Sequence, residues 1–220
     1  MSFKRDLIIF GTGKIAELAT YYFSSDSAYE VICYADLDSV CDLKSEAFGK
    51  KLLPWTDLEN HITPADADMF IAIGYNKTNA IRAERFREAK AKGFKLATYI
   101  SSQAVNMAEC IGENCFILEA NILQPYVSIC DNVFMWSGNH IGHHSVISSH
   151  SFVSSHVVIS GGCIIEPYCF LGVNSCLRDG ITIGEKSVVG AGSIVLKDCP
   201  PRSVFASQET KNRVINRDVI

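Results

Sequence analysis

A chain of 220 residues is long enough for one large domain or two small ones, and 48% apolar residues are enough for a sizeable core. The net charge of -4 offers no basic surface, so neither nucleic acid nor a membrane is expected as a partner. The first apolar run stops after Phe10, too short for a signal peptide or a membrane span, and we therefore expect a cytoplasmic protein. The 9 cysteines include no CxxC pair, which argues against a zinc ribbon and against a redox motif.

Residues 1–98 alternate short apolar runs with helical patterns. Such alternation predicts an open α/β sheet with parallel strands and right-handed crossovers. The expected strands are residues 6–10, 30–36, 68–74 and 94–100, and the expected helices are residues 13–23 and 77–93.

The first expected strand runs into "GTGKIAE", residues 11–17, which has the G-x-G-x-x-A spacing of a phosphate-binding loop. Gly11 and Gly13 permit the tight turn, and the helix that follows offers free N–H groups to a phosphate. Asp36 ends the second strand, where an acidic residue commonly meets a ribose hydroxyl. The alternative is that the glycines only form a strand-to-helix turn. Because residues 1–98 are fewer than a full dinucleotide fold needs, we predict a half-Rossmann domain for a nucleotide sugar and not for NAD.

From residue 105 onward one six-residue period dominates, the signature of a hexapeptide β-helix. We predict a left-handed parallel β-helix over residues 99–202, in which each hexad forms one side of a triangular prism, followed by a C-terminal tail, 203–220. The residues expected to point inward are Val105, Ile111, Ile117, Leu123, Ile129, Met135, Ile141, Ile147, Val153, Ile159, Ile165, Leu171, Leu177, Ile183, Val189 and Val195.

The fourth residue after each inward position is usually small or β-branched. Cysteine behaves there as a modest hydrophobe, which argues against catalytic thiol chemistry. The cysteines expected to pack inside the prism in this way are Cys115, Cys163, Cys169 and Cys199.

The loop "GTGKIAE", the joining stretch "ATYISSQAVN" and the coils ending in "CFLGVNSCLRDGITIGEKSVVGAGSIVLKDCP" resemble one family over nearly the whole chain. They are similar to the hexapeptide acyltransferases that modify bacterial sugars, including bacillosamine-pathway N-acetyltransferases and sialic acid O-acetyltransferases. The resemblance implies acetyl transfer from acetyl-CoA to the amino group of a nucleotide-linked amino sugar. It also implies a homotrimer with active sites between adjacent prisms.

Five of the 6 histidines lie between His140 and His156. The six-residue period directs His144, His150 and His156 to three different sides, so within one subunit they cannot share a metal, and we expect no metal site. His140 and His143 flank one corner, and His156 is expected near the same edge. His150 is expected to be a solvated surface residue.

The resemblance implies that His143 is the general base, which takes a proton from the substrate amine or hydroxyl as that group attacks the thioester. The family often has an acidic residue directly after this histidine, whereas His144 follows it here. We therefore expect His143 and His144 to be the catalytic residues. The group that orients His143 stays open between Asp131, Glu119 and a backbone carbonyl.

The other candidate site residues fall into two groups. For the glycines the alternative role is turn chemistry, and for Asn139 it is a turn between hexads. The expected substrate-binding residues are Gly11, Gly13, Asp36, Asn139, His140, His156 and Asn174, and the expected coenzyme-binding residues are Gly161, Gly172, Gly190, Gly192 and Lys197.

Three alternative functions remain open at this point. The same chemistry could acetylate a sugar hydroxyl. A metal-dependent hydratase of the carbonic anhydrase type would need three histidines that converge across an interface. A non-catalytic scaffold is the third alternative.

Overall fold

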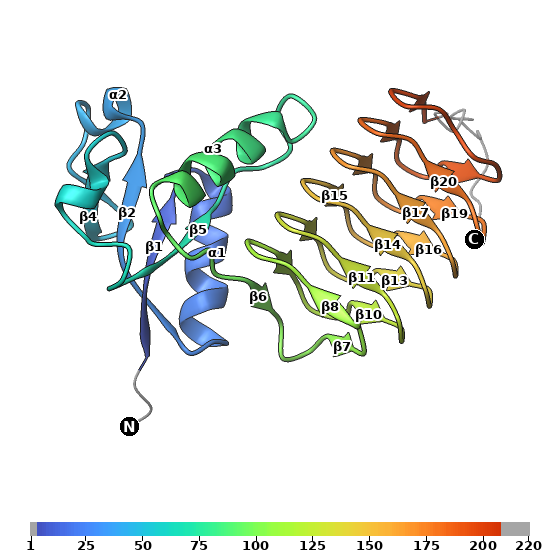
Figure 1. The fold of residues 1–220 in the computed structure, drawn as a ribbon, viewed down its shortest axis with the longest axis horizontal. Helices are drawn as coiled ribbons and strands as arrows, with labels where there is room; N and C mark the ends of the chain where they lie inside the picture. Colours follow the sequence, from blue (N-terminus) through green and yellow to red (C-terminus); the bar gives the residue numbers. More distant parts are fainter. Residues whose placement is uncertain (1–3, 208–220) are drawn as a thin grey trace, which may run out of the picture.

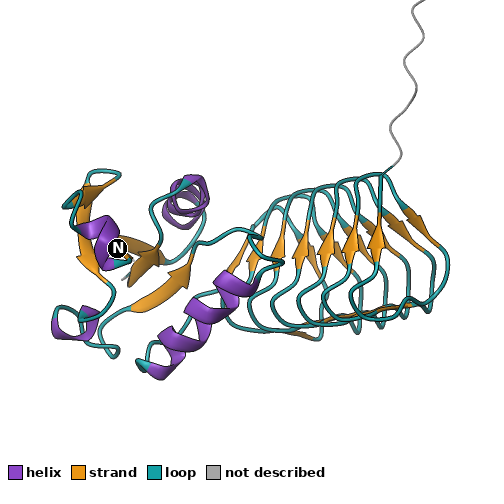
Figure 2. Cartoon of the chain, turned by 90° about the horizontal axis from the view of Figure 1, so that it is seen from above, coloured by secondary structure: helices purple, strands orange, loops and turns teal. Residues whose placement is uncertain are grey.

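The computed structural model of the protein describes residues 4–207. An N-terminal α/β domain is followed by a long prism of stacked coils (Figure 1), and helix α3, Ala80–Ala91, lies beside the first coils of the prism (Figure 2). Helix α1, Lys14–Ser25, contacts the prism through Tyr22, whose ring packs on Phe116. Within the described residues no helix is both long and apolar enough to cross a membrane.

The α/β domain has a five-stranded sheet with the strand order β3-β4-β2-β1-β5, parallel except for the β3–β4 pair. Helices α1 and α3 cover opposite faces of this sheet, since their buried residues belong to two separate apolar clusters. The strands are β1, Arg5–Phe10; β2, Tyr29–Asp36; β3, Glu46–Ala47; β4, Lys50–Pro54; and β5, Asp68–Ile71. The remaining helices are α2, Asp38–Cys41, and the 3-10 helix η1, Leu58–Asn60.

The structure differs from the expected elements at three places. Residues 94–100 do not form a strand of this sheet: Leu96 makes only an isolated bridge to Met69, and Tyr99 begins the prism instead. Strand β4 was not expected from the sequence. Helix α3 begins at Ala80 and not at residue 77, because Lys77, Thr78 and Asn79 have positive φ angles, which end any right-handed helix.

The prism is a left-handed β-helix with three sides, which we number in chain order. The first side consists of β6, Tyr99–Ile100; β9, Phe116–Ile117; β12, Phe134–Met135; β15, Phe152–Val153; β18, Phe170–Leu171; β21, Val188–Val189; and β23, Val204–Phe205. The second side consists of β7, Val105–Asn106; β10, Ile122–Leu123; β13, His140–Ile141; β16, Val158–Ile159; β19, Cys176–Leu177; and β22, Ile194–Val195. The third side consists of β8, Cys110–Ile111; β11, Ser128–Ile129; β14, Val146–Ile147; β17, Ile164–Ile165; and β20, Thr182–Ile183.

The inward positions of the prism follow the predicted period from Ile111 to Val195. They fill one apolar cluster together with the buried Cys115, Cys163 and Cys169. Val105 was expected in this row, but it pairs with Ile122 and points outward with 52% of its surface exposed. The first coil is one residue shorter than the others, so Asn106 takes the register position expected for Val105.

The end of the prism also differs from the expected boundary. Strand β23 pairs with β21, so the prism continues through Phe205, beyond the predicted limit at 202. The rest of the predicted tail, 208–220, lies outside the described residues.

The corners of the prism have a backbone requirement of their own. One residue at each corner has a left-handed φ, a conformation that glycine adopts without strain and that asparagine and histidine tolerate better than most residues. These residues recur every six positions: Asn114, Ala120, Tyr126, Asn132, Gly138, His144, His150, His156, Gly162, Tyr168, Asn174, Gly180, Lys186 and Gly192. Three of the clustered histidines therefore occupy corner positions.

A ladder of phenylalanines joins the two parts of the chain. Four phenylalanines eighteen residues apart point outward from the first side, and those at the first three positions are at most 2% exposed beneath the α/β domain. Phe70 of β5 stacks on one of them at 5.6 Å between ring centroids. The ladder consists of Phe116, Phe134, Phe152 and Phe170. This docking face was not expected from the sequence.

Arg82 of α3 is fully buried against the ladder. Its guanidinium lies 4.2 Å from the ring centroid of Phe134 and donates to the backbone oxygens of Gly74, Asn132 and Ser151 at 3.0–3.2 Å. Burial lowers the pKa of Arg82 to about 9. Backbone carbonyls therefore solvate this charge in the junction between the domain and the prism.

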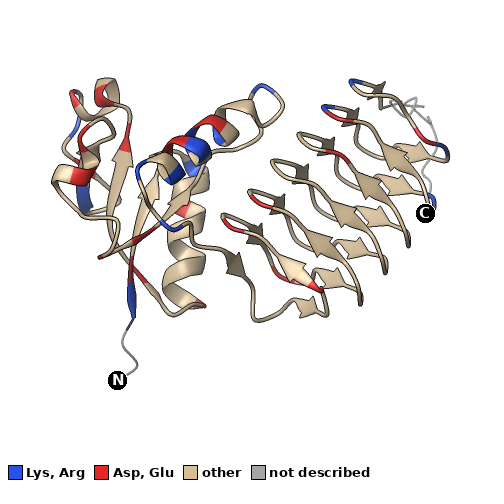
Figure 3. Cartoon of the chain, viewed as in Figure 1, with Lys and Arg blue, Asp and Glu red and all other residues tan. Residues whose placement is uncertain are grey.

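Charged residues gather on the α/β domain and at the prism corners (Figure 3). From β7 through β22 no strand contains Lys, Arg, Asp or Glu. The strand residues of the second and third sides are consequently all uncharged.

Candidate functional site

A pocket of about 480 Å³ lies over the predicted phosphate loop. Strands β1 and β5 are neighbours although the chain visits β2 and β4 between them, so the strand order reverses beside β1. Ligands of open α/β sheets bind at the carboxyl ends of the strands at such a switch point. Gly11 forms this turn with φ +111°, and a Cβ there would lie 3.1 Å from the Ala72 oxygen of the neighbouring segment.

Gly13 leaves the space in front of α1 open. It is the N-terminal cap residue of the helix, with an extended backbone and no side-chain cap, and a Cβ added there would meet no atom within 4 Å. The first N–H groups of a helix lack intrahelical partners and attract anions. The loop can therefore receive a phosphate directly on the backbone.

Asp36 is held at the rim of the same pocket. Its carboxylate accepts hydrogen bonds from the Thr12 hydroxyl and from the Leu37 N–H, both at 2.8 Å. Each oxygen keeps a second lone pair that can accept a ribose hydroxyl. Asp36 thus lines the pocket with its carboxylate already oriented by these two hydrogen bonds.

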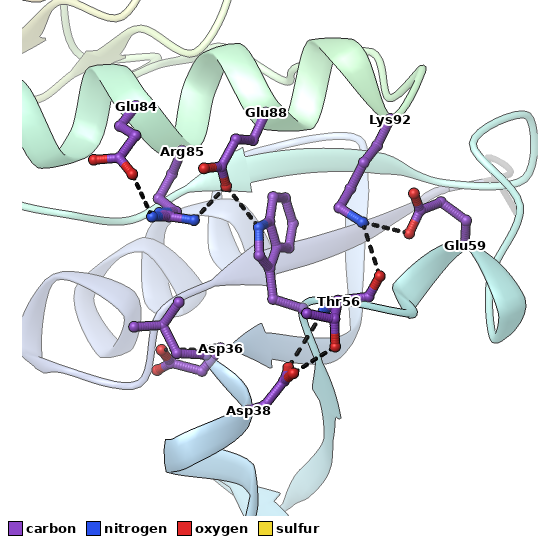
Figure 4. A network of polar contacts seen from close by, with 10 residues as sticks. Asp36, Asp38, Thr56, Glu59, Glu84, Arg85, Glu88 and Lys92 are labelled. Carbon is purple, nitrogen blue, oxygen red and sulfur yellow. Dashed lines mark hydrogen bonds and ion pairs between the residues drawn. The ribbon is translucent and has the colours of Figure 1, made fainter.

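Arg85 of α3 is the basic residue on the opposite rim. Glu84 and Glu88 pair with its guanidinium, and Glu88 also accepts the indole N–H of Trp55 at 2.7 Å (Figure 4). These contacts hold Arg85 against the pocket wall. Lys14, an exposed residue at the start of α1, lines the pocket as well.

His143 and His144 form a contact pair at the corner between the second and third sides. Their Nδ1 atoms are 3.0 Å apart, so one nitrogen donates and the other accepts. The His143 N–H donates to the Gln124 side-chain oxygen at 2.9 Å, and the His144 ring packs on Tyr126 at 4.7 Å between centroids. With Nδ1 of His143 engaged, its Nε2 is the nitrogen left for an external proton.

Gly161 makes room for the His143 ring in the next coil. A Cβ at Gly161 would lie 2.7 Å from Cε1 and 2.8 Å from Nε2 of His143, closer than any ordinary contact. The imidazole consequently lies directly over the backbone of the following coil, in the direction of the C-terminal coils.

The carboxylates suggested as orienting groups for His143 have other partners. Asp131 accepts the Glu113 N–H at 2.8 Å, and Glu119 accepts the hydroxyls of Tyr22 and Ser137 at 2.7 and 2.6 Å. Within the subunit His144 makes the ring contact with His143.

The structure separates the other predicted histidines from this pair. His140 points outward from the second side, paired between Ile122 and Val158. His156 is an exposed residue of the corner between the first and second sides, where its ring covers Gly138. The width of the second side thus lies between His156 and His143 in one subunit.

The expectation for His150 was wrong. The ring is half-buried at the junction with the α/β domain, where it contacts Tyr168 and Phe86 and bonds to Asn132 at 2.8 Å. Burial, together with the positive charges of Arg82 and Arg87, lowers the pKa of His150 to about 4, with Asp131 acting in the opposite direction. His150 is therefore a neutral structural residue.

The two predicted asparagines differ in their surroundings. Asn139 is only 1% exposed: inside the prism its side chain donates to the Asn121 oxygen at 2.9 Å and accepts the Val157 N–H at 2.7 Å. Asn139 therefore supports successive coils and does not face a groove. Asn174 is an exposed corner residue with φ +57°.

Several predicted coenzyme-binding glycines have packing reasons of their own. A Cβ at Gly172 or Gly190 would lie 2.7 or 2.6 Å from backbone atoms of the next coil, and Gly192 has φ +67°. Lys197 is exposed. Among residues 4–207 no group of three or more His, Cys, Asp or Glu side chains could hold a metal ion.

Comparisons with known proteins agree with this architecture. The family described as "Hexapeptide repeat of succinyl-transferase" matches residues 157–197. The bifunctional protein GlmU of Wolbachia pipientis is 25% identical over 86% of this chain, and galactoside O-acetyltransferase of Escherichia coli is 51% identical over 17% of it. The matches span 39% and 18% of these relatives' own lengths.

Two solved structures share the fold over most of both chains. The acetyltransferase domain of PglB from Neisseria gonorrhoeae, in complex with acetyl coenzyme A, has a TM-score of 0.77 and 24% identity, and covers 90% of this chain and 93% of its own. PerB from Caulobacter crescentus, in complex with CoA and GDP-perosamine, has a TM-score of 0.79 and 23% identity, and covers 90% and 92%. The chain folds as a left-handed β-helix of hexapeptide repeats with an α/β domain at its N-terminal end.

Proposed function

We propose that this hexapeptide-repeat protein transfers the acetyl group of acetyl-CoA to the amino group of a nucleotide-linked amino sugar. The observation that carries the proposal is the combination of two sites on one fold: an open phosphate loop and a histidine with a free Nε2 at a prism corner. The PglB domain and PerB, which share the fold, were solved with acetyl coenzyme A and with CoA and GDP-perosamine, respectively. A structure of a PerB variant with one histidine replaced by asparagine has a TM-score of 0.74.

The nucleotide sugar binds over the phosphate loop. Its diphosphate meets the open N-terminus of α1 at Gly13, and Asp36 accepts a ribose hydroxyl. Both proposed reactants are cytoplasmic metabolites, so we place the reaction in the cytoplasm.

His143 is the general base of the transfer. We assign the donor role in the Nδ1–Nδ1 contact to His143, since a His143 that donates its Nδ1–H to His144 has an unprotonated Nε2 that can accept a proton. As the sugar nitrogen bonds to the thioester carbonyl carbon, Nε2 takes the proton of that nitrogen. The carbon–sulfur bond then breaks, and the imidazolium returns the proton to the departing CoA thiolate, so no acyl-enzyme forms.

The coenzyme binds along the prism from His143 toward the C-terminal coils, between adjacent subunits of the proposed trimer. Gly161 leaves the backbone of the following coil exposed beside the imidazole, and Gly192 supplies a corner without a side chain. Lys197 can meet the coenzyme phosphates, which carry negative charge.

The protein assembles as a homotrimer around the second side of the prism. This side carries no charged strand residue and exposes Ile122, Val158 and Ile194 by 39–69% of their surfaces. Exposed apolar rows of this kind mark protein interfaces. A closed threefold ring buries the apolar row of every copy. His140 lies in the same row, and His143 lies at the corner where the row ends.

O-acetylation is the second candidate. The observation that favours it is the 51% identity over 37 residues to galactoside O-acetyltransferase. The same base could take a proton from a hydroxyl group.

One screen tests the proposal and separates the two acceptors. The protein is incubated with acetyl-CoA and a panel of UDP-, GDP- and dTDP-linked amino sugars, beside the corresponding sugars without an amino group, and products are identified by mass spectrometry. We expect one acetyl group to be added only to an amino sugar, and His143→Ala to abolish the reaction. Acetylation of the sugars without an amino group would favour O-transfer. No product with any acceptor would overturn the proposal.

A further inference from the structure

The pocket over the phosphate loop continues into a trough between α1 and the prism. A second cavity of about 480 Å³ is lined by Lys14, Ile15, Glu17, Leu18, Tyr21 and Trp136. Lys14 and Ile15 line both cavities, so the trough begins at the helix end where the phosphates are proposed to bind. A group attached to the terminal phosphate therefore enters the trough next.

Trp136 forms the prism wall of this trough. It directly follows β12, is half-buried, and its ring lies 6.0 Å from that of Phe152 between centroids. Over residues 4–207 no protein group accepts a hydrogen bond from its indole N–H, and this N–H is not among the buried polar atoms that lack a partner, so it is accessible to a ligand. Tyr21, on the helix wall, is 66% exposed.

The chemistry of this trough fits a pyranose ring. A sugar ring has an apolar C–H face and a rim of hydroxyl groups, whereas Trp and Tyr combine an apolar face with one polar atom. The indole can cover the C–H face, and its N–H can donate to a hydroxyl oxygen. The Glu17 carboxylate on the helix side can accept a hydrogen bond from a sugar hydroxyl.

The level of Trp136 along the prism relates it to the catalytic pair. Trp136 and His143 belong to the same coil but lie at opposite ends of the second side, so one subunit cannot bring both to a single sugar. A rotation about a threefold axis parallel to the prism leaves every coil at its own height. In a trimer that packs through the second side, His143 of the partner subunit then stands at the height of Trp136.

From this arrangement we infer that Trp136 is the sugar platform of the enzyme: the acceptor ring stacks on its indole and presents the reacting group to His143 of the partner subunit. This inference rests on the proposed function and assigns it a specificity-determining residue. The nucleotide is bound by the α/β domain, the sugar by the prism wall, and the base comes from the neighbouring copy.

Binding measurements test the platform separately from catalysis. UDP, GDP and dTDP are titrated alone and as their glucose conjugates into the wild type, Trp136→Phe and Trp136→Ala by calorimetry. We expect Trp136→Ala to weaken the sugar conjugate that binds the wild type by roughly tenfold, as the loss of one aromatic contact does, and to leave the free nucleotide within about twofold. The affinity of Trp136→Phe for the sugar conjugate should lie between those of the wild type and Trp136→Ala. The matched control is Val173→Ala, an exposed apolar residue of the same corner that lies outside the trough.

Fluorescence gives a second readout. The chain has 2 tryptophans, and Trp55 is 5% exposed inside the α/β domain, so the Trp55→Phe variant reports on Trp136 alone. The sugar conjugate should change the emission of this variant, and the free nucleotide should not. Thermal unfolding of each variant shows whether the fold is retained.

The outcomes separate the inference from the function on which it rests. If the wild type acetylates an amino sugar while Trp136→Ala keeps the Michaelis constant of the wild type for that sugar, the platform is wrong and the function stands. If Trp136→Ala weakens the nucleotide and its conjugate equally, the residue only supports the loop, and the inference fails as well. If no sugar is acetylated but the conjugate binding depends on Trp136, the sugar site stands and the transfer reaction is wrong.

Discussion

Adding one methyl group beneath the imidazole proposed as the base should impair turnover without unfolding the protein. Gly161 has an unstrained backbone conformation that alanine can adopt, and its place under the His143 ring is the reason for a glycine. In Gly161→Ala the new Cβ would lie 2.7 Å from Cε1 of His143, whereas carbon atoms rest about 3.5–4.0 Å apart. The ring must therefore move by about 1 Å.

A displacement of this size is large for a catalytic base, since about 1 Å of misplacement can cost ~10²-fold in rate. His143 is an exposed side chain, so the ring can swing away with little effect on folding, within about 0.5 kcal/mol for a surface change. We expect kcat of Gly161→Ala to fall by about 10–100-fold. The Michaelis constant for the sugar and the midpoint of thermal unfolding should stay near those of the wild type.

A double-mutant cycle identifies the cause. Steady-state rates are measured for the wild type, Gly161→Ala, His143→Ala and the double variant, with the acceptor found in the screen. Once the ring is removed, the methyl group has nothing to displace, so the double variant should equal His143→Ala. Additive losses would show that Gly161 acts through coenzyme binding, and full activity of Gly161→Ala would refute the role given to His143.

Three further perturbations address the interface, the loop and the junction. Val158→Asp, which adds a charge to the second side, should convert the proposed trimer to monomers in light scattering, and Ile164→Asp, which adds the same charge to an exposed position of the third side, should leave it intact. Gly13→Val should raise the Michaelis constant for the nucleotide sugar at least ~10-fold and leave that for acetyl-CoA unchanged. A Cβ at Gly13 meets no protein atom within 4 Å, so the new side chain fits the fold and obstructs only the phosphate. An equal rise for both substrates would show that the loop is only a structural turn. His150 has its folded pKa lowered to about 4 against an ordinary 6.5, so stability present above pH 6.5 should be lost as the pH falls toward 4, by up to roughly 3 kcal/mol, in urea titrations. His150→Asn should flatten this dependence, and an unchanged slope would contradict the lowered pKa.

The hexad period predicted most of the prism because every coil repeats the same packing requirement. An inward residue that contacts only the coils above and below it is chosen by that local environment, so the pattern holds from Ile111 to Val195. It fails at Val105, where the first coil has a neighbour on one side only and can lose a residue without disturbing a row. Strand β4 and the left-handed turn before α3 lie in the domain without a repeat, where a single occurrence of a pattern carries little information.

The sequence contains a signal for the docking of the domain on the prism, but this signal lies outside the pattern of inward residues. Phenylalanine recurs every eighteen residues at an outward position, where a solvated side would carry polar side chains. A large apolar residue on an outward row predicts a covering partner, here the α/β domain of the same chain. Arg82 could not have been found in this way, because its carbonyl partners come from the loop after β5 and from two successive turns between the third and first sides, segments that only the folded chain brings together.

The histidine cluster shows how backbone and catalytic requirements can be told apart in a repeat. His144, His150 and His156 stand at corners whose left-handed φ itself favours histidine, asparagine or glycine, so their spacing needs no catalytic explanation. His143 stands one position before such a corner, where the backbone sets no such preference, and its ring is accommodated by a glycine in the next coil. A side chain that the turn does not require, with space kept for it by a neighbour, is the one to test first as the base. His144 meets both requirements, since it forms the corner and also engages Nδ1 of His143. His144→Asn keeps the corner geometry and should lower kcat by about tenfold through the altered partner of His143. His150→Asn, the same substitution at a corner between the third and first sides and away from the proposed interface, should leave kcat within about twofold.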